Sequence, residues 1–355
     1  MVLISFILLS ISTLWSAEIL PKFLTKQPLD SLRFISMDGR YAYVQRRPGV
    51  LGLVSSFRNN DFITDQSQSE FLISGSRFKQ RLVIEVIPAA QTEFNVMKNH
   101  KIHVVDFGNH KPREIGLGRN PRLHLQDEWI TYYDTQSRIL TVENLLTTKK
   151  YKIAMGVKAG AFTIPEAEMV SNDTLIYTDI NDQGYAGLIK YNLITQKSSV
   201  LYKSTMNATH LEICQDKNYL AIGEFPFEGV TRGSKIMKIQ LSDATNLAGY
   251  ETIYSSNAQD LGQILCMENS IYFVKTLKQH KRLNIKTTEA AQLDLKTQEV
   301  KIRTGFSNVT QFSQMDGRVL IPYRGEFYVL EGNANISDDK LKAIPDKKEE
   351  LPLDI

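Results

Sequence analysis

The sequence lacks several features that mark particular classes of protein. Lys and Arg total 42 against 39 for Asp and Glu, and the net charge of +3 is spread without a basic block, which argues against a dedicated nucleic-acid binder. The helical hydrophobic period is nearly absent. Neither the Gly-x-Ser-x-Gly elbow of hydrolases nor a P-loop occurs. With 42% hydrophobic residues, the chain of 355 residues is nevertheless globular and can bury a large core.

The longest uncharged apolar run lies at the N-terminus. Residues 2–15 carry no charge and are followed by Ser16, Ala17 and Glu18. About 14 apolar residues fit a signal peptide better than a membrane-spanning helix, which needs about 20. We therefore expect cleavage after Ala17 and a periplasmic or secreted mature protein with no membrane span. An uncleaved anchor is the alternative, because no Lys or Arg precedes the run.

An apolar strand, a short polar turn and a second apolar strand recur seven times along the chain. Alternating apolar positions with Asp, Asn, Gly or Glu at the turn are typical of a β-hairpin. The seven hairpins cover residues 32–44, 71–87, 122–134, 167–179, 211–224, 264–275 and 309–323. A second hairpin follows five of them, at residues 102–117, 139–153, 188–202, 236–254 and 290–302. The mean period of about 46 residues lies in the range of propeller blades and repeat arrays.

Four strands per repeat predict an all-β fold, a single seven-bladed β-propeller of four-stranded antiparallel blades over residues 18–332. A four-stranded sheet cannot bury both faces alone, and a closed ring stacks each sheet against its neighbours. The last repeat offers three strands, so we expect residues 18–25 to supply the fourth and close the ring. A loose N-terminal arm is the alternative. Residues 333–355 are charged and predict a flexible tail.

The turns of two repeats resemble those of a known family. ISMDGRYAYV (35–44) and FSQMDGRVLIPY (312–323) resemble the Ser-x-Asp-Gly-Arg pattern of exported, WD40-like TolB-type propeller repeats. YNLITQKS and LDLKTQEV look like the outer half of the same blades. The resemblance covers nearly all of residues 18–332 and implies a fold without a chemistry, because Asp and Gly serve to form the turn. The Asp-Gly-Arg turn is intact in only two repeats, and the WD dipeptide is absent.

Cys214 and Cys266 are the only cysteines, and they lie at matching places in two neighbouring repeats. Two cysteines in an exported chain favour a disulfide. Side chains that point the same way one repeat apart are poorly placed for one, since the Cα atoms of a bridge lie within about 7 Å. We therefore expect two buried thiols, with the disulfide as the alternative.

The densest group of metal-ligating residue types is His100, His103, Asp106 and His110. On a strand that starts near Lys101, His103 and Asp106 face opposite sides, while the other two histidines fall in the turns at either end. We expect solvated polar groups here, and neither a metal site nor a cofactor.

Three carboxylates are candidates for chemistry in the central channel. Glu168, Glu212 and Glu268 lie in or beside the first strands of their repeats, which are innermost in a propeller. A pair of them would suit acid and base catalysis on a carbohydrate. We expect instead that they bind water or basic groups of neighbouring blades.

Two long polar insertions, residues 57–70 and 88–99, are the other candidate surface, because function often lies on loops over a rigid scaffold. Phe57, Phe62 and Phe94 are candidate contact anchors there, and the alternative is that the insertions merely cover blade edges. We expect an exported, non-catalytic propeller that binds protein partners in a bacterial periplasm or cell envelope. The alternatives are a carbohydrate-acting enzyme and a small-molecule or metal sensor. The sequence indicates no oligomeric state.

Overall fold

The computed structural model of the chain describes residues 32–35, 41–47, 50–55, 59–63, 69–74, 81–88, 99–106, 112–156, 164–181, 184–207, 209–226, 233–241, 249–256, 261–280, 285–303, 312–315, 318–323 and 326–330. The predicted signal peptide, the closing strand at residues 18–25 and the tail at residues 333–355 lie outside this part of the chain. No helix in the described residues is long and apolar enough to cross a membrane.

The described strands form antiparallel sheets in chain order. The first sheet contains β1 (Leu32–Ile35), β2 (Tyr41–Arg47), β3 (Val50–Ser55) and β4 (Asn59–Ile63). A seven-stranded sheet follows, with β5 (Ser69–Ser74), β6 (Arg81–Pro88), β7 (His100–Asp106), β8 (Pro112–His124), β9 (Trp129–Asp134), β10 (Ile139–Asn144) and β11 (Lys150–Ala154). Within it β8 bends from one set of four strands into the next, since its first half pairs with β7 and its second half with β9.

The remaining sheets repeat the four-stranded pattern, with one exception at the end. One contains β12 (Ala167–Ser171), β13 (Thr174–Ile180), β14 (Tyr185–Asn192) and β15 (Lys197–Asn207), and the next β16 (Thr209–Gln215), β17 (Tyr219–Pro226), β18 (Ser234–Gln240) and β19 (Glu251–Ser256). Then come β20 (Leu261–Met267), β21 (Ser270–His280), β22 (Ile285–Asp294) and β23 (Val300–Arg303). The last sheet has three described strands, β24 (Ser313–Met315), β25 (Arg318–Tyr323) and β26 (Glu326–Leu330).

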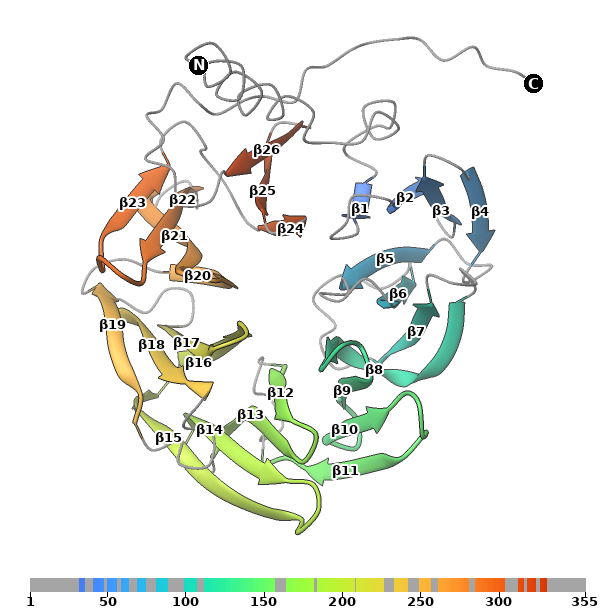
Figure 1. The fold of residues 1–355 in the computed structure, drawn as a ribbon, viewed down its shortest axis with the longest axis horizontal. Helices are drawn as coiled ribbons and strands as arrows, with labels where there is room; N and C mark the ends of the chain where they lie inside the picture. Colours follow the sequence, from blue (N-terminus) through green and yellow to red (C-terminus); the bar gives the residue numbers. More distant parts are fainter. Residues whose placement is uncertain are drawn as a thin grey trace, which may run out of the picture.

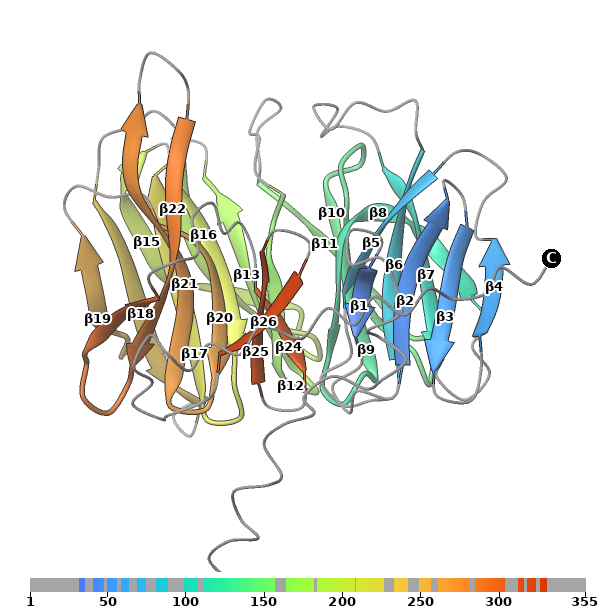
Figure 2. The ribbon, with the colours of Figure 1, turned by 90° about the horizontal axis from the view of Figure 1, so that it is seen from above.

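The sheets stand around a common axis as a ring (Figure 1). In each sheet the first strand lies nearest the axis and the last strand lies at the rim, so that β12, β16 and β20 are innermost and β15, β19 and β23 outermost. Viewed from the side, the strands run between the two faces of the ring (Figure 2). The hairpins predicted from the sequence are confirmed in every repeat by antiparallel pairing of their strands.

One predicted loop is partly a strand. Residues 57–70 were expected to form a polar insertion, but Asn59–Ile63 pairs with β3 as the outermost strand of the first sheet. An outermost strand contacts one neighbour in its sheet, and therefore requires fewer apolar residues than an inner strand. The sequence NNDFI has no alternating apolar pattern, which explains why the strand was missed.

The core lies between neighbouring sheets. Trp129 and Val142 from the β8–β11 part of the ring pack with Met169, Leu175 and Leu193 of the next sheet, and all five are buried. Equivalent clusters fill the following two junctions. The β12–β15 and β16–β19 sheets are thus buried on both faces by their neighbours.

Paired turns make one face of the ring regular. In four blades, a leucine that follows the third strand donates its backbone N–H to a carbonyl in the turn between the first and second strands. The four contacts are Leu145 to Glu128 (2.7 Å), Leu193 to Asp173 (2.7 Å), Leu241 to Asn218 (2.9 Å) and Leu295 to Asn269 (2.7 Å). We call the side of the ring that carries these first and third turns the turn face. In three of the third turns an Asn or Asp side chain accepts two backbone N–H groups, which accounts for the recurring Asn/Asp-Leu-x-Thr motif.

Candidate functional site

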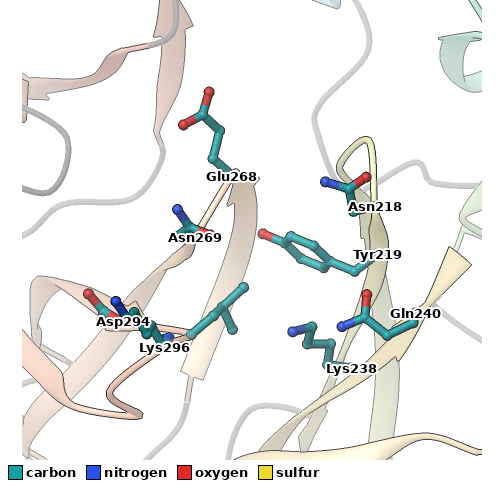
Figure 3. A pocket seen from close by; sticks show the side chains of 9 residues that line it. Asn218, Tyr219, Lys238, Gln240, Glu268, Asn269, Asp294 and Lys296 are labelled. Atoms are coloured by element: carbon teal, nitrogen blue, oxygen red, sulfur yellow. Dashed lines mark hydrogen bonds between the residues drawn. The ribbon is translucent and has the colours of Figure 1, made fainter. Parts of the chain in front are cut away.

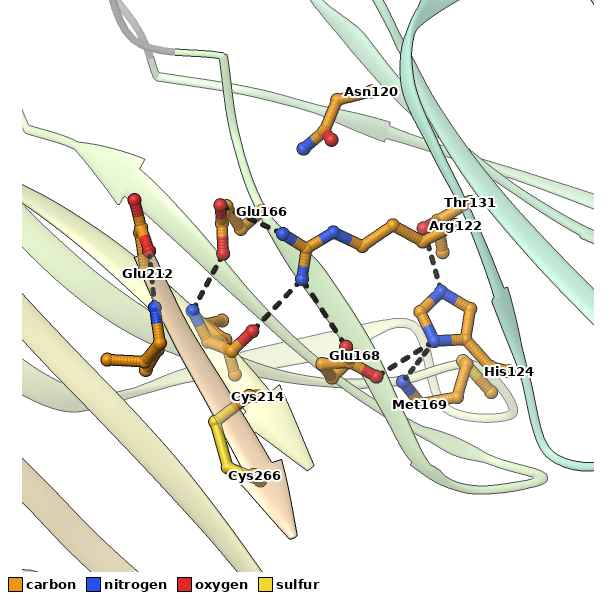
Figure 4. Close-up of polar contacts among 12 residues, drawn as sticks. Asn120, Arg122, His124, Thr131, Glu166, Glu168, Met169, Glu212, Cys214 and Cys266 are labelled. Atoms are coloured by element: carbon orange, nitrogen blue, oxygen red, sulfur yellow. Dashed lines mark hydrogen bonds and ion pairs between the residues drawn. A yellow bond between two sulfur atoms is a disulfide. The ribbon is translucent and has the colours of Figure 1, made fainter. Parts of the chain in front are cut away.

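A cluster of ionisable side chains joins the innermost strands of three successive sheets (Figure 4). Arg122 of β8 lies at its centre, with Nη2 at 2.9 Å from Glu166 Oε1 and Nη1 at 3.4 Å from Glu168 Oε1. Nη1 also donates to the carbonyl oxygen of Ile213 on β16 at 3.0 Å. One guanidinium therefore connects three sheets. We call Arg122, His124, Glu166, Glu168 and Glu212 the Arg122 cluster.

His124 fixes the second carboxylate of the cluster. Its Nδ1 lies 3.0 Å from Glu168 Oε2 and its Nε2 lies 2.9 Å from Thr131 Oγ1. The His124 side chain is 1% exposed and that of Glu168 is 9% exposed. The backbone N of Met169 lies 3.4 Å from Nδ1 as well, so both ring nitrogens have partners and the imidazole is held between two sheets.

The same contact recurs at three junctions of the ring. A side-chain oxygen at the inner edge of one sheet accepts the backbone N–H of the innermost segment of the next sheet. The three contacts join Glu166 Oε2 to Ile213 N (2.7 Å), Glu212 Oε2 to Ile264 N (3.1 Å) and Gln263 Oε1 to Phe312 N (2.9 Å). Because Gln263 takes the place of a carboxylate in the third contact, an acceptor oxygen is what this position supplies.

Burial and charge shift two pKa values in the cluster. Burial raises the pKa of Glu166 to about 7, because the loss of hydration and the nearby Glu212 and Glu168 outweigh the attraction of Arg122 and the hydrogen bond from Ile213. Burial alone would lower the pKa of Arg122, but the carboxylates of Glu166, Glu168 and Glu212 raise it overall. The guanidinium stays charged, and Glu166 changes its protonation near neutral pH.

The Glu166 carboxyl makes stability depend on pH. Its pKa is about 7 in the folded protein against 4.5 for the unperturbed group, so the folded state binds more protons between these values. Stability contributed by the protonated group is present below about pH 4.5 and is lost as the pH rises through about 7. We expect the wild type to lose about 1 to 3 kcal/mol more unfolding free energy between pH 5 and pH 8 than Glu166→Gln does.

Urea unfolding of both proteins across this pH range measures the difference. The exposed Glu299→Gln variant is the control and should follow the wild type. Parallel pH profiles for the wild type and Glu166→Gln would contradict the assignment of the raised pKa to Glu166.

The structure brings two of the three predicted carboxylates together. Glu168 and Glu212 lie in the Arg122 cluster with Glu166, whereas Glu268 lies in the turn between β20 and β21, where its backbone N–H donates to Asp216 Oδ2 at 2.6 Å. Sequence reasoning missed Glu166. Glu166 is equivalent to Glu212 and Gln263 through the contact that each makes with the next sheet, which the sequence does not reveal.

The expectation of two buried thiols is wrong. Cys214 of β16 and Cys266 of β20 form a disulfide, with their Cα atoms 5.7 Å apart, and not two buried thiols. Innermost strands of neighbouring sheets converge near the axis of the ring, so matching positions one repeat apart come close enough for a bridge. Both residues are buried at the junction, and the described part of the chain has no free cysteine.

The two histidines on β7 are not solvent-exposed as the sequence predicted. His100 and His103 were expected among solvated groups, but both are buried, because β7 lies between β6 and β8 and packs against β9. His100 Nδ1 lies 2.6 Å from Glu85 Oε1, and Arg119 Nε donates to the same oxygen at 2.7 Å. Asp106 pairs with Arg81 instead, and His110 lies outside the described residues. The described residues contain no group of three or more His, Cys, Asp and Glu that could hold a metal ion.

The predicted aromatic anchors fall mainly outside the described part of the chain. Phe57 and Phe94 are not among the described residues. Phe62 lies on β4, where its backbone pairs with Leu51. The role of all three as contact anchors stays a prediction.

Comparison with known proteins gives the fold alone. No protein-family model matches the sequence, and no curated protein matches it. The tricorn protease matches in structure with a TM-score of 0.58 and 12% identity over 91% of this chain, and a prolyl endopeptidase with 0.56 and 10% over 89%. The β-propeller domain of the Trilobed protease from Pyrococcus furiosus matches with a TM-score of 0.50 and 14% identity over 74% of this chain and 83% of that domain.

The fold is a β-propeller. This chain covers 35% of the tricorn protease chain and 50% of the prolyl endopeptidase chain. At identities this low the similarity extends to the propeller architecture, and function has to be argued from the residues of this chain.

Proposed function

We propose that this chain is an exported, non-catalytic β-propeller scaffold that binds protein partners in a bacterial periplasm or cell envelope. We further propose seven blades, related to TolB-type repeats and closed by the strand at residues 18–25. The division of the seven-stranded sheet at β8 supports this number, since it yields two blades that share one long strand. The three-stranded last sheet leaves a place for a closing strand.

The disulfide supports export. Disulfides form and persist in oxidising compartments such as the bacterial periplasm and are rare in the cytosol. The Cys214–Cys266 bridge is therefore consistent with the uncharged apolar run at residues 2–15, which predicts a signal peptide.

The use of the innermost carboxylates is the observation that carries the non-catalytic role. Glu166 and Glu212 accept backbone N–H groups of the following sheets, and Glu168 pairs with His124 and Arg122. A general acid or base must present its carboxyl to a substrate, whereas each of these carboxyl groups has at least one oxygen bound in a contact between blades. The ring is thereby made rigid, and rigid blades present binding surfaces at little entropic cost.

A carbohydrate-acting enzyme is the second candidate, and one observation favours it. The pKa of about 7 for Glu166 would suit a general acid near neutral pH, and Glu212 lies close enough to contribute to that shift. Such an enzyme would have to release Glu166 from both Arg122 and Ile213 during each catalytic cycle.

Crosslinked affinity purification from the native host tests the scaffold. The chain from residue 18 to 355 is compared with one that ends at Gly332, and captured proteins are identified by mass spectrometry. We expect both to recover the same envelope protein, and reciprocal capture with that protein should return this chain. Loss of the partner on truncation would move the contact to the tail, and recovery of nothing above background would contradict the scaffold role.

A further inference from the structure

A polar hollow opens on the turn face between the β16–β19 sheet and the β20–β23 sheet (Figure 3). Its volume is about 420 Å³. Side chains from both sheets line it, among them Asn218, Tyr219, Lys238, Gln240, Asn269 and Lys296. Ligand pockets usually have a mainly apolar lining, so amides and ammonium groups in this hollow point to a polar ligand.

The equivalent space two junctions earlier is packed with apolar side chains. Strand pairing places Val142 and Tyr151 of the β8–β11 region where the β16–β19 sheet has Lys238 and Glu251. Val142 is fully buried, and Tyr151 stacks on Trp129 with ring centroids 6.3 Å apart. Lys190 of β14 and Gln292 of β22 occupy the same position, three residues before the equivalent leucine, so among these four blades only the β8–β11 blade has an apolar residue there. Lys238 is distinguished by the open hollow that it lines.

The ammonium group of Lys238 is held in place inside the hollow. Its Nζ lies 5.3 Å from the centroid of the Tyr219 ring, a cation–π contact. In the amide orientation that satisfies its neighbours, Gln240 accepts from Lys238 Nζ at 3.2 Å and donates to the Asn218 carbonyl at 3.0 Å. Among the described residues, no carboxylate forms an ion pair with Lys238. The hollow thus contains a positioned, half-buried cation without a direct ion pair, and the exposed Glu251 is its cross-strand neighbour on β19.

Neither of the two acidic residues that line the hollow, Asp294 and Glu268, forms an ion pair with Lys238. Asp294 Oδ1 accepts the backbone N–H groups of Lys296 and Thr297 and is committed to its own turn. The carboxylate of Glu268 points away from Lys238 (Figure 3). Glu268 stands at the rim, where it would repel a ligand with several negative charges and tolerate one with a single carboxylate.

We propose that this hollow binds the carboxylate of an Asp or Glu side chain of a protein partner, which pairs with Lys238 and accepts hydrogen bonds from the surrounding amides. The inference rests on the proposed scaffold function and assigns one contact of that scaffold. A sugar is disfavoured because Tyr219 is only 3% exposed and the ammonium of Lys238 lies over its ring, so that no aromatic face is open for stacking. Tyr219 also donates its hydroxyl to the Ser270 carbonyl, which fixes the ring between the two blades.

Titration of the full mature chain with short peptides tests the site. The probes are acetylated and amidated Gly-Ser-Glu-Ser-Gly and the same peptide with Gln in place of Glu, followed by NMR of 13C-labelled lysine side chains. We expect the Glu peptide to shift the Lys238 signal in a saturable way and the Gln peptide to bind at least tenfold more weakly. Raising the salt concentration should weaken binding of the Glu peptide.

Two variants separate this site from nonspecific attraction. Lys238→Met should abolish binding of the Glu peptide, while the exposed Lys197→Met, at the start of β15 directly after a third turn, should leave it unchanged. Equal affinity for the two peptides, or undiminished binding by Lys238→Met, would overturn the proposal, and so would Lys238-dependent binding of digalacturonate without peptide binding. Partner capture by wild type and Lys238→Met alike would reject the hollow while leaving the scaffold function intact. No capture by either would reject the scaffold function itself.

Discussion

Removing the Cys214–Cys266 disulfide is expected to lower the unfolding free energy of the protein by about 4 kcal/mol. The bridge joins residues separated by 52 positions, and its main effect is to restrict the unfolded chain. It also connects the innermost strands of neighbouring blades, where the two cysteines pack among buried side chains. Urea unfolding of the wild type and of the Cys214→Ala, Cys266→Ala double variant measures the loss.

Reductant provides the control for this prediction. Reduction should destabilise the wild type and leave the double variant unchanged, since the variant has no cysteine left to reduce. Alkylation under denaturing conditions should label neither cysteine until reductant is added. A double variant within about 1 kcal/mol of the oxidised wild type would show that the bridge contributes little.

Replacing Arg122 with Met is expected to destabilise the protein by about 3 kcal/mol. The side chains of Glu166 and Glu168 are 17% and 9% exposed, so loss of the guanidinium leaves two largely buried carboxyl groups without their cation. Protonation of Glu166, whose pKa Arg122 lowers, relieves only part of this cost, because Glu168 keeps its charge. The Ile213 carbonyl loses a donor as well. Urea unfolding at pH 7 measures the change.

A matched variant and a compensating one sharpen this test. Arg113→Met, on the exposed outer part of β8, should change stability by no more than about 0.5 kcal/mol. Adding Glu166→Gln and Glu168→Gln to Arg122→Met should recover part of the loss, because the unpaired charges disappear together. A loss below about 1 kcal/mol for Arg122→Met, or no recovery in the triple variant, would count against the cluster as a bond between blades.

The local pattern of the sequence was sufficient to predict most of the strands. Each hairpin combines alternating apolar residues with a permissive turn, and both signals are local. The Asn-Leu-x-Thr turns could be predicted equally well, because the side chains of Asn144 and Asn192 accept backbone N–H groups only two and three residues ahead. The strand at Asn59–Ile63 was not predicted, because an edge strand does not need an alternating apolar pattern.

The candidate site was less accessible because it depends on contacts between repeats. Glu168 and Glu212 were selected as acids on innermost strands, but their partners Arg122 and Ile264 lie in other blades. The sequence also favoured two buried thiols over the disulfide, because the cysteines lie in different repeats. A hairpin pattern does not report how closely innermost strands approach one another at the axis, and that distance decides whether matching side chains meet.

A direct comparison of turnover and stability for the wild type and Glu166→Gln tests the central claim, that the innermost carboxylates join blades and perform no catalysis. Both proteins are incubated with a panel of neutral and acidic oligosaccharides, and their unfolding free energies are measured in the same buffer. The account predicts no turnover above the protein-free control for either protein, together with altered stability in Glu166→Gln. Turnover by the wild type that falls about 100-fold in Glu166→Gln, at unchanged unfolding free energy, would contradict it and establish Glu166 as a general acid.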